Sequence, residues 1–443
     1  MQDSPADLCS GRGRIRLHAG GRSRFHAQAG ALPLNTPTAA AARPSITVLV
    51  PTFNRAAMLA ECLESLLAQT LPPTQILVVN DGSTDETPEV LARFGDTIEV
   101  LEVSQGGKAG AVNAGLARVT GEYLWVFDDD DVALPDALER IVAPLEADRE
   151  LGFTYGMYAP ARSRPDGRIG PAEGTSWLPN TGKAGMLPSL LLGNYMGGAA
   201  LFARTACYRE LGGLSPELIR SQDYDLAIRM VRRFRGAQVE GPPFYLYRKH
   251  DGLRGDARTR FGAAESRHRW LEYDQIIFRR LREELPITAH LPPGADAGRE
   301  IRHALIHRMV VSAFKLMYPE ARADLAAIAE LDDSAPLTPD EKGLLVLLIR
   351  TEPYYGKGSI LDQPGFFADL GRLARRYPAM RRIRREIVRA LLTRLGSDRQ
   401  WSALREVIRT ARLVRLAHFP GRRLRQGAPG PAPRDVQPQD VQP

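Results

Sequence analysis

The hydrophobic pattern between residues 46 and 127 alternates between strand-like and helix-like periods. Four apolar runs have the length of strands: 46–50, 75–79, 97–103 and 123–127. After the first run the apolar positions recur with helical spacing, at Leu59, Cys62, Leu63, Leu66 and Leu67. Strands that alternate with helices over short loops predict βαβ units. The expected fold class is therefore α/β, with a mainly parallel sheet sandwiched by helices.

Two further helices are expected in this region, after which the pattern loosens. Ser83 and Glu86 have the spacing of a capping box, which predicts a helix over 84–94, and a third helix is expected around 111–119. From about 140 to 200, glycines and prolines interrupt the apolar pieces. A helix that begins at Ser221 and a last strand at 244–247 complete the α/β part.

Beyond about residue 255 the strand signals vanish, and helical patterns recur at 261–284, 298–330, 338–350 and 366–419. We therefore expect an α/β domain at 44–255, followed by an α-helical C-terminal region at 256–420. The two ends, 1–43 and 421–443, lack periodicity and are predicted to be disordered tails. For residues 1–43 the alternative is a start codon placed too early, which would make them no part of the native protein.

Residues 380–395 have a basic amphipathic pattern. One helical face carries the apolar side chains, and six arginines surround it; the apolar members are Met380, Ile383, Ile387, Leu391 and Leu395. Such a helix can lie on an anionic membrane surface, which would attach the protein peripherally to the inner face of a membrane. Packing of the apolar stripe within a helical bundle is the favoured interpretation, because tertiary packing is the usual role of such a face.

Composition narrows the class of protein. Hydrophobic residues make up 44% and charged residues 25% of the 443 residues, as in ordinary globular proteins. The net charge of +7 is modest and gives no ground for a nucleic-acid partner. Three scattered cysteines form neither a disulfide framework nor a zinc-ligand spacing, and no apolar run approaches the ~18–20 residues of a membrane span. A cytoplasmic protein is expected.

Polar clusters follow each of the four predicted strands. They are the segment 51–55 (PTFNR), the segment 80–83 (NDGS), the loop 106–108 (GGK) and the four aspartates 128–131. In a parallel sheet, ligands bind beyond the carboxyl ends of the strands. Since all four clusters fall at that edge, the sequence predicts a ligand site there.

The four aspartates form the densest of these clusters. Carboxylates this close together repel one another and resist burial unless a cation or a hydrogen-bonding ligand compensates them. A divalent metal that holds a diphosphate would supply this compensation, because hard oxygen ligands suit Mg²⁺ or Mn²⁺. A solvated acidic turn is the alternative.

The other clusters carry candidate nucleotide contacts. Asp81 would accept a hydrogen bond from the imide N–H of uracil or thymine, a donor that cytosine lacks, although Asp-Gly is also a common turn dipeptide. Lys108 would meet a phosphate or a base, and donors in the segment 51–55 would hold the nucleotide; ordinary loop roles are the alternatives. Asn113, on the next helix, would contribute only if that helix end faced the ligand.

Three charged side chains near the end of the α/β part complete the candidates. Asp223 lies near the start of a helix, where the dipole favours acidic residues, but it would also serve as a general base that deprotonates an acceptor hydroxyl. Arg248 and His250 follow the last strand and would reach a phosphate or a metal. An ordinary surface histidine is the simpler interpretation of His250.

Taken together in their order and spacing, the motifs PTFNR, NDGSTDET, GKAGAVNAGL, FDDDD and SQDYD resemble those of the family 2 glycosyltransferases (GT2), which have the GT-A fold. The resemblance covers about residues 45–250. It implies that Pro51, Thr52 and Arg55 surround the nucleotide and that Asp81 contacts the base. Asn54 is a nucleotide-binding candidate from its place after the first strand.

The resemblance also implies a DxD motif at Asp128 and Asp130. The first aspartate would lie near the ribose and the second on the metal; Asp129 and Asp131 are alternatives in register. The family's usual Glu-Asp pair, whose Asp is the base, is Gln222-Asp223 here, so the base is kept and the Glu contact is lost. The segment YRKH is similar to the family's YRxH ending, which makes Arg248 and His250 secondary candidates.

The expected function is an inverting transfer of a sugar from a nucleotide-diphosphate sugar, with UDP- or dTDP-sugars favoured, to an acceptor hydroxyl. Mn²⁺ or Mg²⁺ would be the cofactor. The acceptor would be a glycan, a lipid-linked glycan or a protein, in cell-envelope or extracellular glycan biosynthesis. One alternative is a sugar nucleotidyltransferase, which would require a glycine-rich loop after the first strand. The other is a non-catalytic nucleotide-sugar-binding scaffold.

Overall fold

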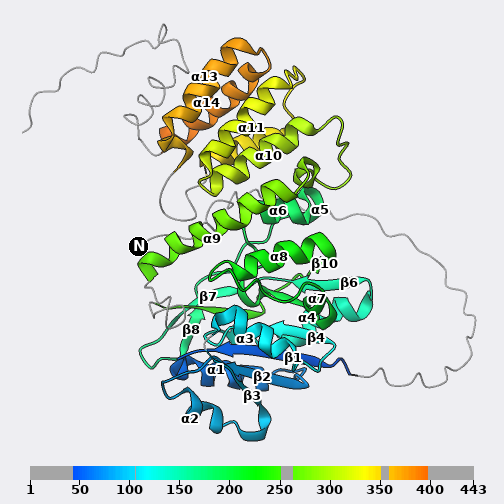
Figure 1. Ribbon diagram of the computed structural model, residues 1–443, viewed down its shortest axis with the longest axis vertical. Helices are drawn as coiled ribbons and strands as arrows, with labels where there is room; N and C mark the ends of the chain where they lie inside the picture. Colours follow the sequence, from blue (N-terminus) through cyan, green and yellow to red (C-terminus); the bar gives the residue numbers. More distant parts are fainter. Residues whose placement is uncertain (1–42, 105, 251–262, 351–358, 398–443) are drawn as a thin grey trace, which may run out of the picture.

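A computed structural model describes residues 43–104, 106–250, 263–350 and 359–397 (Figure 1). In the view of Figure 1 an α/β part occupies the lower half and a helical region lies above it. The predicted fold class, a mainly parallel sheet with helices on its faces followed by a helical C-terminal region, is confirmed. Both predicted tails and the helical pattern expected at 398–419 lie outside the described residues.

The central sheet has seven strands in the order β10-β6-β9-β4-β1-β2-β3. Its four predicted strands are parallel neighbours: β1 (Ile46–Thr52), β2 (Gln75–Asn80), β3 (Glu99–Glu102) and β4 (Tyr123–Val126). Thr52 pairs with Asn80, which pairs in turn with Glu102, so the carboxyl ends of β1, β2 and β3 meet at one edge. The polar clusters follow at this edge, as predicted.

Among the remaining strands of this sheet, one runs antiparallel to its neighbours and the other two keep the common direction. β9 (Leu201–Arg204) runs antiparallel between β4 and β6 (Leu151–Tyr155), and β10 (Arg235–Gln238) is parallel to β6. A second sheet was not predicted from the sequence. It has four strands in the order β5-β11-β7-β8, namely Val132–Ala133, Tyr245–Lys249, Ala159–Ser163 and Ile169–Ala172.

Helices cover both faces of the central sheet because the side chains of each strand alternate in direction. On one face Val48 and Val50 pack with α1 (Ala56–Leu67), α2 (Thr87–Ala92) and α4 (Ala137–Ala147). On the other face Leu49 packs with further helices, which are α3 (Gly107–Leu116), α6 (Met186–Leu192), α7 (Thr205–Glu210) and α8 (Gln222–Arg233). The short helix α5 (Thr181–Ala184) precedes α6.

Three local predictions in this part were wrong. The second helix begins at Thr87 and not at residue 84, and no capping box forms, because the Ser83 hydroxyl accepts a hydrogen bond from Asn54 N–H instead. The third helix begins earlier than expected, at Gly107. Leu67, at the last position of α1, is 39% exposed and not part of the buried stripe.

The C-terminal helical region begins with α9, whose inner face packs into the α/β part. Ile277 and Phe278 of α9 belong to the same buried cluster as Tyr224 of α8. The later helices have a cluster of their own, and the bounds are α9 (Ala263–Glu284), α10 (Ile301–Phe314), α11 (Tyr318–Glu330), α12 (Pro339–Arg350), α13 (Pro364–Arg376) and α14 (Met380–Ser397). Among the described residues, none of the helices is both long enough and apolar enough to cross a membrane.

The favoured interpretation of the basic amphipathic segment is confirmed. Met380, Ile383, Ile387 and Leu391 of α14 are buried in the cluster that α10–α14 form together. These four side chains of the stripe are therefore covered by protein, whereas four of the surrounding arginines are exposed: Arg381, Arg382, Arg385 and Arg389.

A buried pair of histidines lies where the helical region meets α6. The Nδ1 atoms of His290 and His307 are 3.0 Å apart, and His307 Nε2 lies 3.1 Å from the carbonyl oxygen of Pro188, to which it donates. Burial, reinforced by the nearby charges of Arg308 and Arg282, lowers the pKa of His290 to about 3. Burial, with His290 as the next cause, also lowers the pKa of His307 well below its usual range. Both rings are therefore neutral in the folded protein.

We expect this histidine pair to make the stability depend on pH. Unfolded histidines bind protons below about pH 6.5, whereas the folded pair does not, so the free energy of unfolding is highest above pH 6.5 and falls as the pH drops toward 3. The expected slope is about 1.4 kcal/mol per pH unit for each histidine once the pH is well below 6.5. Urea denaturation between pH 7 and pH 5 measures it. A His290→Gln variant should lose about half of this pH dependence, and an unchanged slope would contradict the assignment.

Candidate functional site

The aspartate loop begins directly after β4, at the edge where the parallel strands end. Asp128 is partly exposed, and one of its carboxylate oxygens accepts a short hydrogen bond from Lys108 Nζ at the start of α3. Burial alone lowers the pKa of Lys108, but the Asp128 carboxylate, with smaller contributions from Asp223 and Asp130, outweighs burial and raises it. The ammonium group of Lys108 is therefore charged and lies within the field of three carboxylates.

Asp129 turns to the side of the loop that faces the PTFNR segment. Its carboxylate lies 4.0 Å from Nε of Arg55, and the residue is 8% exposed. Burial, followed by the charge of Asp130, raises the pKa of Asp129 to about 7, although Arg55 and the hydroxyl of Thr52 oppose the rise. The structure thus brings Thr52, Arg55 and Asp129 together. Pro51 lies beside them as a buried residue near the end of β1.

Asp130 meets His250 through the second sheet. β5 follows the aspartate loop directly and pairs antiparallel with β11, so that the residues after β11 return to the loop. As a result, His250 Nε2 lies 2.9 Å from Asp130 Oδ2, and both side chains are mostly shielded from solvent. This pair joins a hard oxygen and an imidazole nitrogen.

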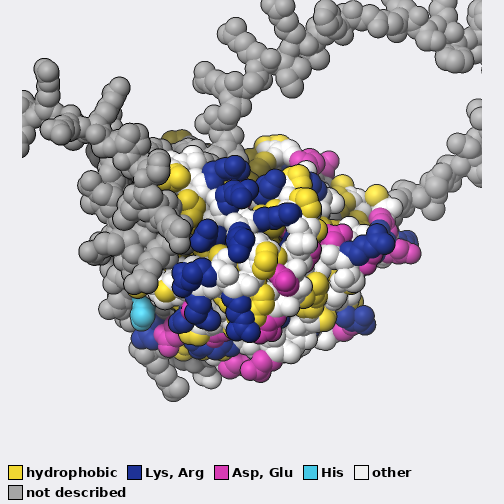
Figure 2. All heavy atoms as spheres, turned by 90° about the horizontal axis from the view of Figure 1, so that it is seen from above, with side chains coloured by type: hydrophobic (Ala, Val, Ile, Leu, Met, Phe, Trp, Pro, Cys, Tyr) yellow, Lys and Arg dark blue, Asp and Glu magenta, His cyan; other side chains and the backbone are white. Residues whose placement is uncertain are grey.

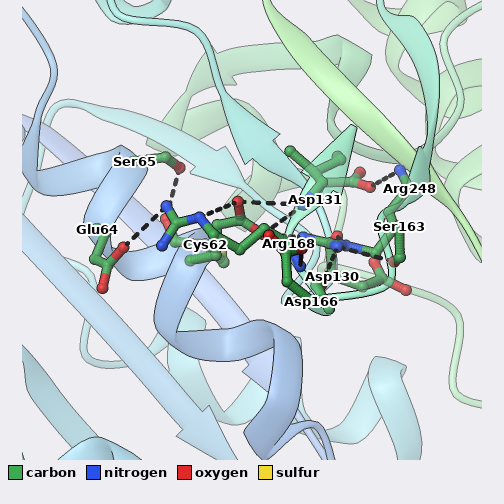
Figure 3. A network of polar contacts seen from close by, with 12 residues as sticks. Cys62, Glu64, Ser65, Asp130, Asp131, Ser163, Asp166, Arg168 and Arg248 are labelled. Atoms are coloured by element: carbon green, nitrogen blue, oxygen red, sulfur yellow. Dashed lines mark hydrogen bonds and ion pairs between the residues drawn. The ribbon is translucent and has the colours of Figure 1, made fainter. Parts of the chain in front are cut away.

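Arg248 is fully buried and binds the end of the aspartate loop. Its guanidinium donates to the backbone oxygen of Asp130 (2.7 Å), to Ser163 Oγ (3.0 Å) and to Glu61, while its backbone N–H donates to Asp131 Oδ1 (2.9 Å). Figure 3 shows Arg248 among Asp130, Asp131 and Ser163. Asp131 is itself fully buried. Arg248 and Asp131 therefore hold the loop, while Asp128 and Asp130 are the more accessible members.

The PTFNR and DGSTDET segments are joined to each other by hydrogen bonds around Asn54. Asn54 has a positive φ of 53°, a conformation that asparagine tolerates better than most residues. Its side-chain oxygen accepts from the backbone N–H of Thr84 (2.7 Å) and Asp85 (3.3 Å), and Asp85 in turn accepts from Ala56 N–H. Asn54 thus shapes the loop beside the site through these contacts.

Asp81 lies at the end of β2 and is 3% exposed. Its two carboxylate oxygens accept hydrogen bonds from the backbone N–H groups of Gly106 (2.6 Å) and Gly107 (2.8 Å). Asp81 therefore fixes the N-terminus of α3, which carries Lys108.

Asp223 lies in the first turn of α8 and faces a glycine loop that the sequence analysis did not include among the site residues. Asp223 Oδ2 accepts from Gly198 N–H (2.9 Å) and from Asn194 Nδ2 (3.2 Å). A Cβ at Gly197 would lie 3.0 Å from Asp223 Oδ2, and one at Gly198 would lie 3.4 Å from Asp128 Oδ2. The loop thus packs between Asp223 and the aspartate loop. The two glycines of the segment 194–198 (NYMGG) are the sequence signal that could have marked it.

Two of the predicted site residues form hydrogen bonds with the segment that precedes α8. Asn113 exchanges two 2.8 Å hydrogen bonds with the backbone of Leu214, through which α3 holds the loop before α8. Gln222 is 8% exposed and donates to the carbonyl oxygen of Leu218. Glu61, which pairs with Arg248, was not predicted, and no local signal marked it because its partner lies far along the chain.

The donor set suits a divalent cation that is shared with a substrate. Asp130 and His250 offer one carboxylate and one imidazole, and Asp128 adds a second carboxylate nearby. Within the described residues no group of three or more acidic, histidine or cysteine side chains could hold a metal by itself. Mg²⁺ and Mn²⁺ sites of this kind take one or two protein ligands and complete their shell with phosphate oxygens and water. The residues present fit such a metal.

Comparison with known proteins finds a family model that matches most of this α/β part. Residues 47–209 match the family model described as glycosyl transferase family 2. An uncharacterized glycosyltransferase of Rickettsia felis is 32% identical over 43% of this chain and 32% of its own length. A hyaluronan synthase of Pasteurella multocida is 26% identical over 42% of this chain and 19% of its own length. The match therefore spans only about a fifth to a third of these two relatives.

Among solved structures, S. aureus TarS 1-349 in complex with UDP-GlcNAc has a TM-score of 0.45 and 16% identity, over 83% of this chain and 91% of that chain. The predicted resemblance is confirmed by the family match and by the homologous glycosyltransferases. Residues 47–209 of this chain match glycosyl transferase family 2, and they lie in the α/β part with the mainly parallel sheet.

Proposed function

We propose that this chain is an inverting glycosyltransferase that moves a sugar from a nucleotide-diphosphate sugar to an acceptor hydroxyl. The observation that carries the proposal is the meeting of two acidic groups across one loop. Gly198 donates to Asp223 Oδ2 and packs against Asp128, whose other oxygen binds Lys108. Asp223, the proposed base, thus lies on one side of Gly198, and Asp128 with Lys108 lies on the other.

The donor would lie along the edge of the sheet from Asp81 to the aspartate loop. The Asp81 carboxylate would accept a hydrogen bond from the imide N–H of uracil or thymine, so UDP- or dTDP-sugars are the favoured donors. Arg55, Asp128 and Asp129 would contact the nucleotide, and Lys108 would neutralise phosphate charge. Asp130 and His250, with Asp128 near them, would hold Mn²⁺ or Mg²⁺. Once bound, the metal would stabilise the charge of the departing diphosphate.

Asp223 would take the proton from the acceptor hydroxyl while the oxygen of that hydroxyl attacks the anomeric carbon. Its hydrogen bonds from Asn194 and Gly198 end on one oxygen, Oδ2, and fix the carboxylate plane. We assign the proton transfer to Oδ1. One base on the acceptor side is sufficient for a direct displacement, which inverts the anomeric centre.

The acceptor class is proposed from the relatives. Chondroitin and hyaluronan synthases of Pasteurella multocida are among them, each 26% identical over 42% of this chain. A glycan or lipid-linked glycan acceptor, in the building of an envelope or extracellular polysaccharide, is therefore favoured over a protein acceptor. The cytoplasmic side of the membrane is the proposed place of reaction.

A basic face on α13 and α14 supports attachment to that membrane. Residues 372–394 contain nine arginines and a single acidic residue, Glu386. Seven of the arginines are exposed: Arg372, Arg375, Arg376, Arg381, Arg382, Arg385 and Arg389. Figure 2, seen from above the helical region, shows Lys and Arg side chains gathered on this face. Because the apolar stripe of α14 is buried, the attachment we propose is electrostatic and does not insert a helix.

The metal assignment is tested by Asp130→Asn and His250→Ala. Each variant should weaken Mn²⁺-dependent UDP binding by about tenfold or more, a loss typical even of groups that only support a metal ligand. Isothermal calorimetry with and without EDTA measures this. Glu150→Gln, at an exposed acid before β6, is the control and should bind as the wild type does. Wild-type affinity in both site variants would refute the assignment.

The base assignment is tested by Asp223→Asn. The variant should keep donor affinity and lose turnover by about 100-fold or more, because only the proton transfer is removed. Mn²⁺-dependent hydrolysis or transfer from a panel of UDP-, dTDP- and GDP-sugars provides the readout. Glu217→Gln, an exposed acid shortly before α8, should retain activity. Retained turnover in Asp223→Asn would exclude it as the base.

The membrane proposal is tested by sedimentation with vesicles. The protein should bind vesicles containing phosphatidylglycerol, should not bind pure phosphatidylcholine, and should be released by salt. Replacing Arg375, Arg376, Arg382 and Arg385 by Gln should abolish binding. The matched control replaces exposed arginines of the α/β part: Arg93, Arg118, Arg162 and Arg233. Equal loss in both sets would show a general charge effect and overturn the assigned face.

A further inference from the structure

A buried chain of polar contacts links the C-terminal helical region to the start of α8. Ser221, the residue before α8, donates from Oγ to Asp274 Oδ1 of α9 at 2.5 Å. Lys315, which follows α10, donates from Nζ to Asp274 Oδ2 at 2.8 Å. The three residues are 8%, 3% and 3% exposed. This contact chain therefore reaches from the end of α10 to within two residues of Asp223.

Neighbouring side chains fix the arrangement of these polar contacts. The Lys315 ammonium lies 4.6 Å from the ring centroids of both Tyr224 and Phe278, where the ring faces attract a cation. The backbone oxygen of Lys315 accepts a 2.9 Å hydrogen bond from Gln275. An ion pair this deeply buried is a poor source of stability, because desolvation offsets the attraction between the charges. Such a pair can instead fix the relative position of the segments that it joins.

Ser221 connects these polar contacts to the start of α8. It has φ 57° and ψ 21°, a left-handed conformation that costs a non-glycine residue free energy and persists only where its surroundings fix it. Its carbonyl oxygen accepts the first bond of the helix, from Asp225 N–H at 2.9 Å. The conformation of Ser221 therefore sets the direction in which the first turn, and Asp223 with it, projects toward Gly198.

We infer that Asp274 and Lys315 are positioning residues for Asp223, which act through the hydroxyl of Ser221. Through these two residues the helical region supports the acceptor side of the site. This inference rests on the proposed function, since it assigns the role of Asp223 as base. A misplacement of about 1 Å of a reacting group can cost about 100-fold in rate, so loss of the tether should lower kcat.

A double-mutant cycle tests the inference. Ser221→Gly removes the hydroxyl but accepts the left-handed conformation, so it should lower kcat about 10- to 100-fold while the donor KM stays within about twofold. Asp274→Asn combined with Lys315→Met removes the charges together and should also lower kcat. Added to Ser221→Gly, this pair should cause no further loss, because all three residues act on one link. Independent, multiplying losses would overturn the inference.

Ser312→Ala is the matched control. Ser312 is a buried serine of α10, and its hydroxyl accepts a hydrogen bond from Arg282. It should leave both kcat and KM within about twofold of the wild type, as an independent site would. A loss of kcat in Ser312→Ala equal to that in Ser221→Gly would make the effect one of general stability and would contradict the inference.

A measurement without turnover separates this inference from the proposed function. Hydrogen exchange of the peptide spanning residues 221–226 should be faster in Ser221→Gly and in the Asp274/Lys315 variant than in the wild type, and unchanged in Ser312→Ala. If no nucleotide sugar is turned over by the wild type, the proposed function fails while this result still decides whether the tether holds the first turn of α8. Unchanged exchange in the tether variants would refute the inference.

Discussion

Repulsion among four adjacent carboxylates is the constraint on which the geometry of this protein depends. The structure relieves it by sending the aspartates in different directions toward different partners. Asp128 meets Lys108, Asp129 faces Arg55, and the backbone of Arg248 binds Asp131. Each of these partners comes from a different part of the chain, so the folded α/β part is needed before the loop can adopt its shape. Because Asp130 is the member that meets His250, a bound cation would complete this separation of charge.

The central strands and the edge at which the site lies could be predicted because they depend on local patterns. Runs of apolar residues indicate strands wherever they are placed, and parallel order follows from the helices between them. The second sheet could not be found in this way. β5 has two residues and no periodicity, and its pairing with β11 joins segments more than a hundred residues apart. The encounter of Asp130 with His250 depends on that pairing.

Other features were not predicted because they too depend on contacts between distant segments. Ser83 has the sequence of a helix cap, yet its hydroxyl binds the backbone of Asn54, and α2 begins later as a result. Gly197 and Gly198 are two glycines among many in a loosely patterned stretch. Only the folded arrangement shows that their missing side chains leave space between Asp223 and Asp128. In each case the deciding contact comes from a distant segment and so leaves no signal in the local sequence.

The contact between Asp81 and the start of α3 has a consequence for how nucleotide preference can change over time. The carboxylate proposed to read the base also anchors the two glycines that precede Lys108. A substitution that alters base preference would therefore also displace the lysine at the phosphate end. Base preference and the position of Lys108 are therefore coupled. A new donor preference must arise through changes around Asp81 that keep its hydrogen bonds to the two glycines.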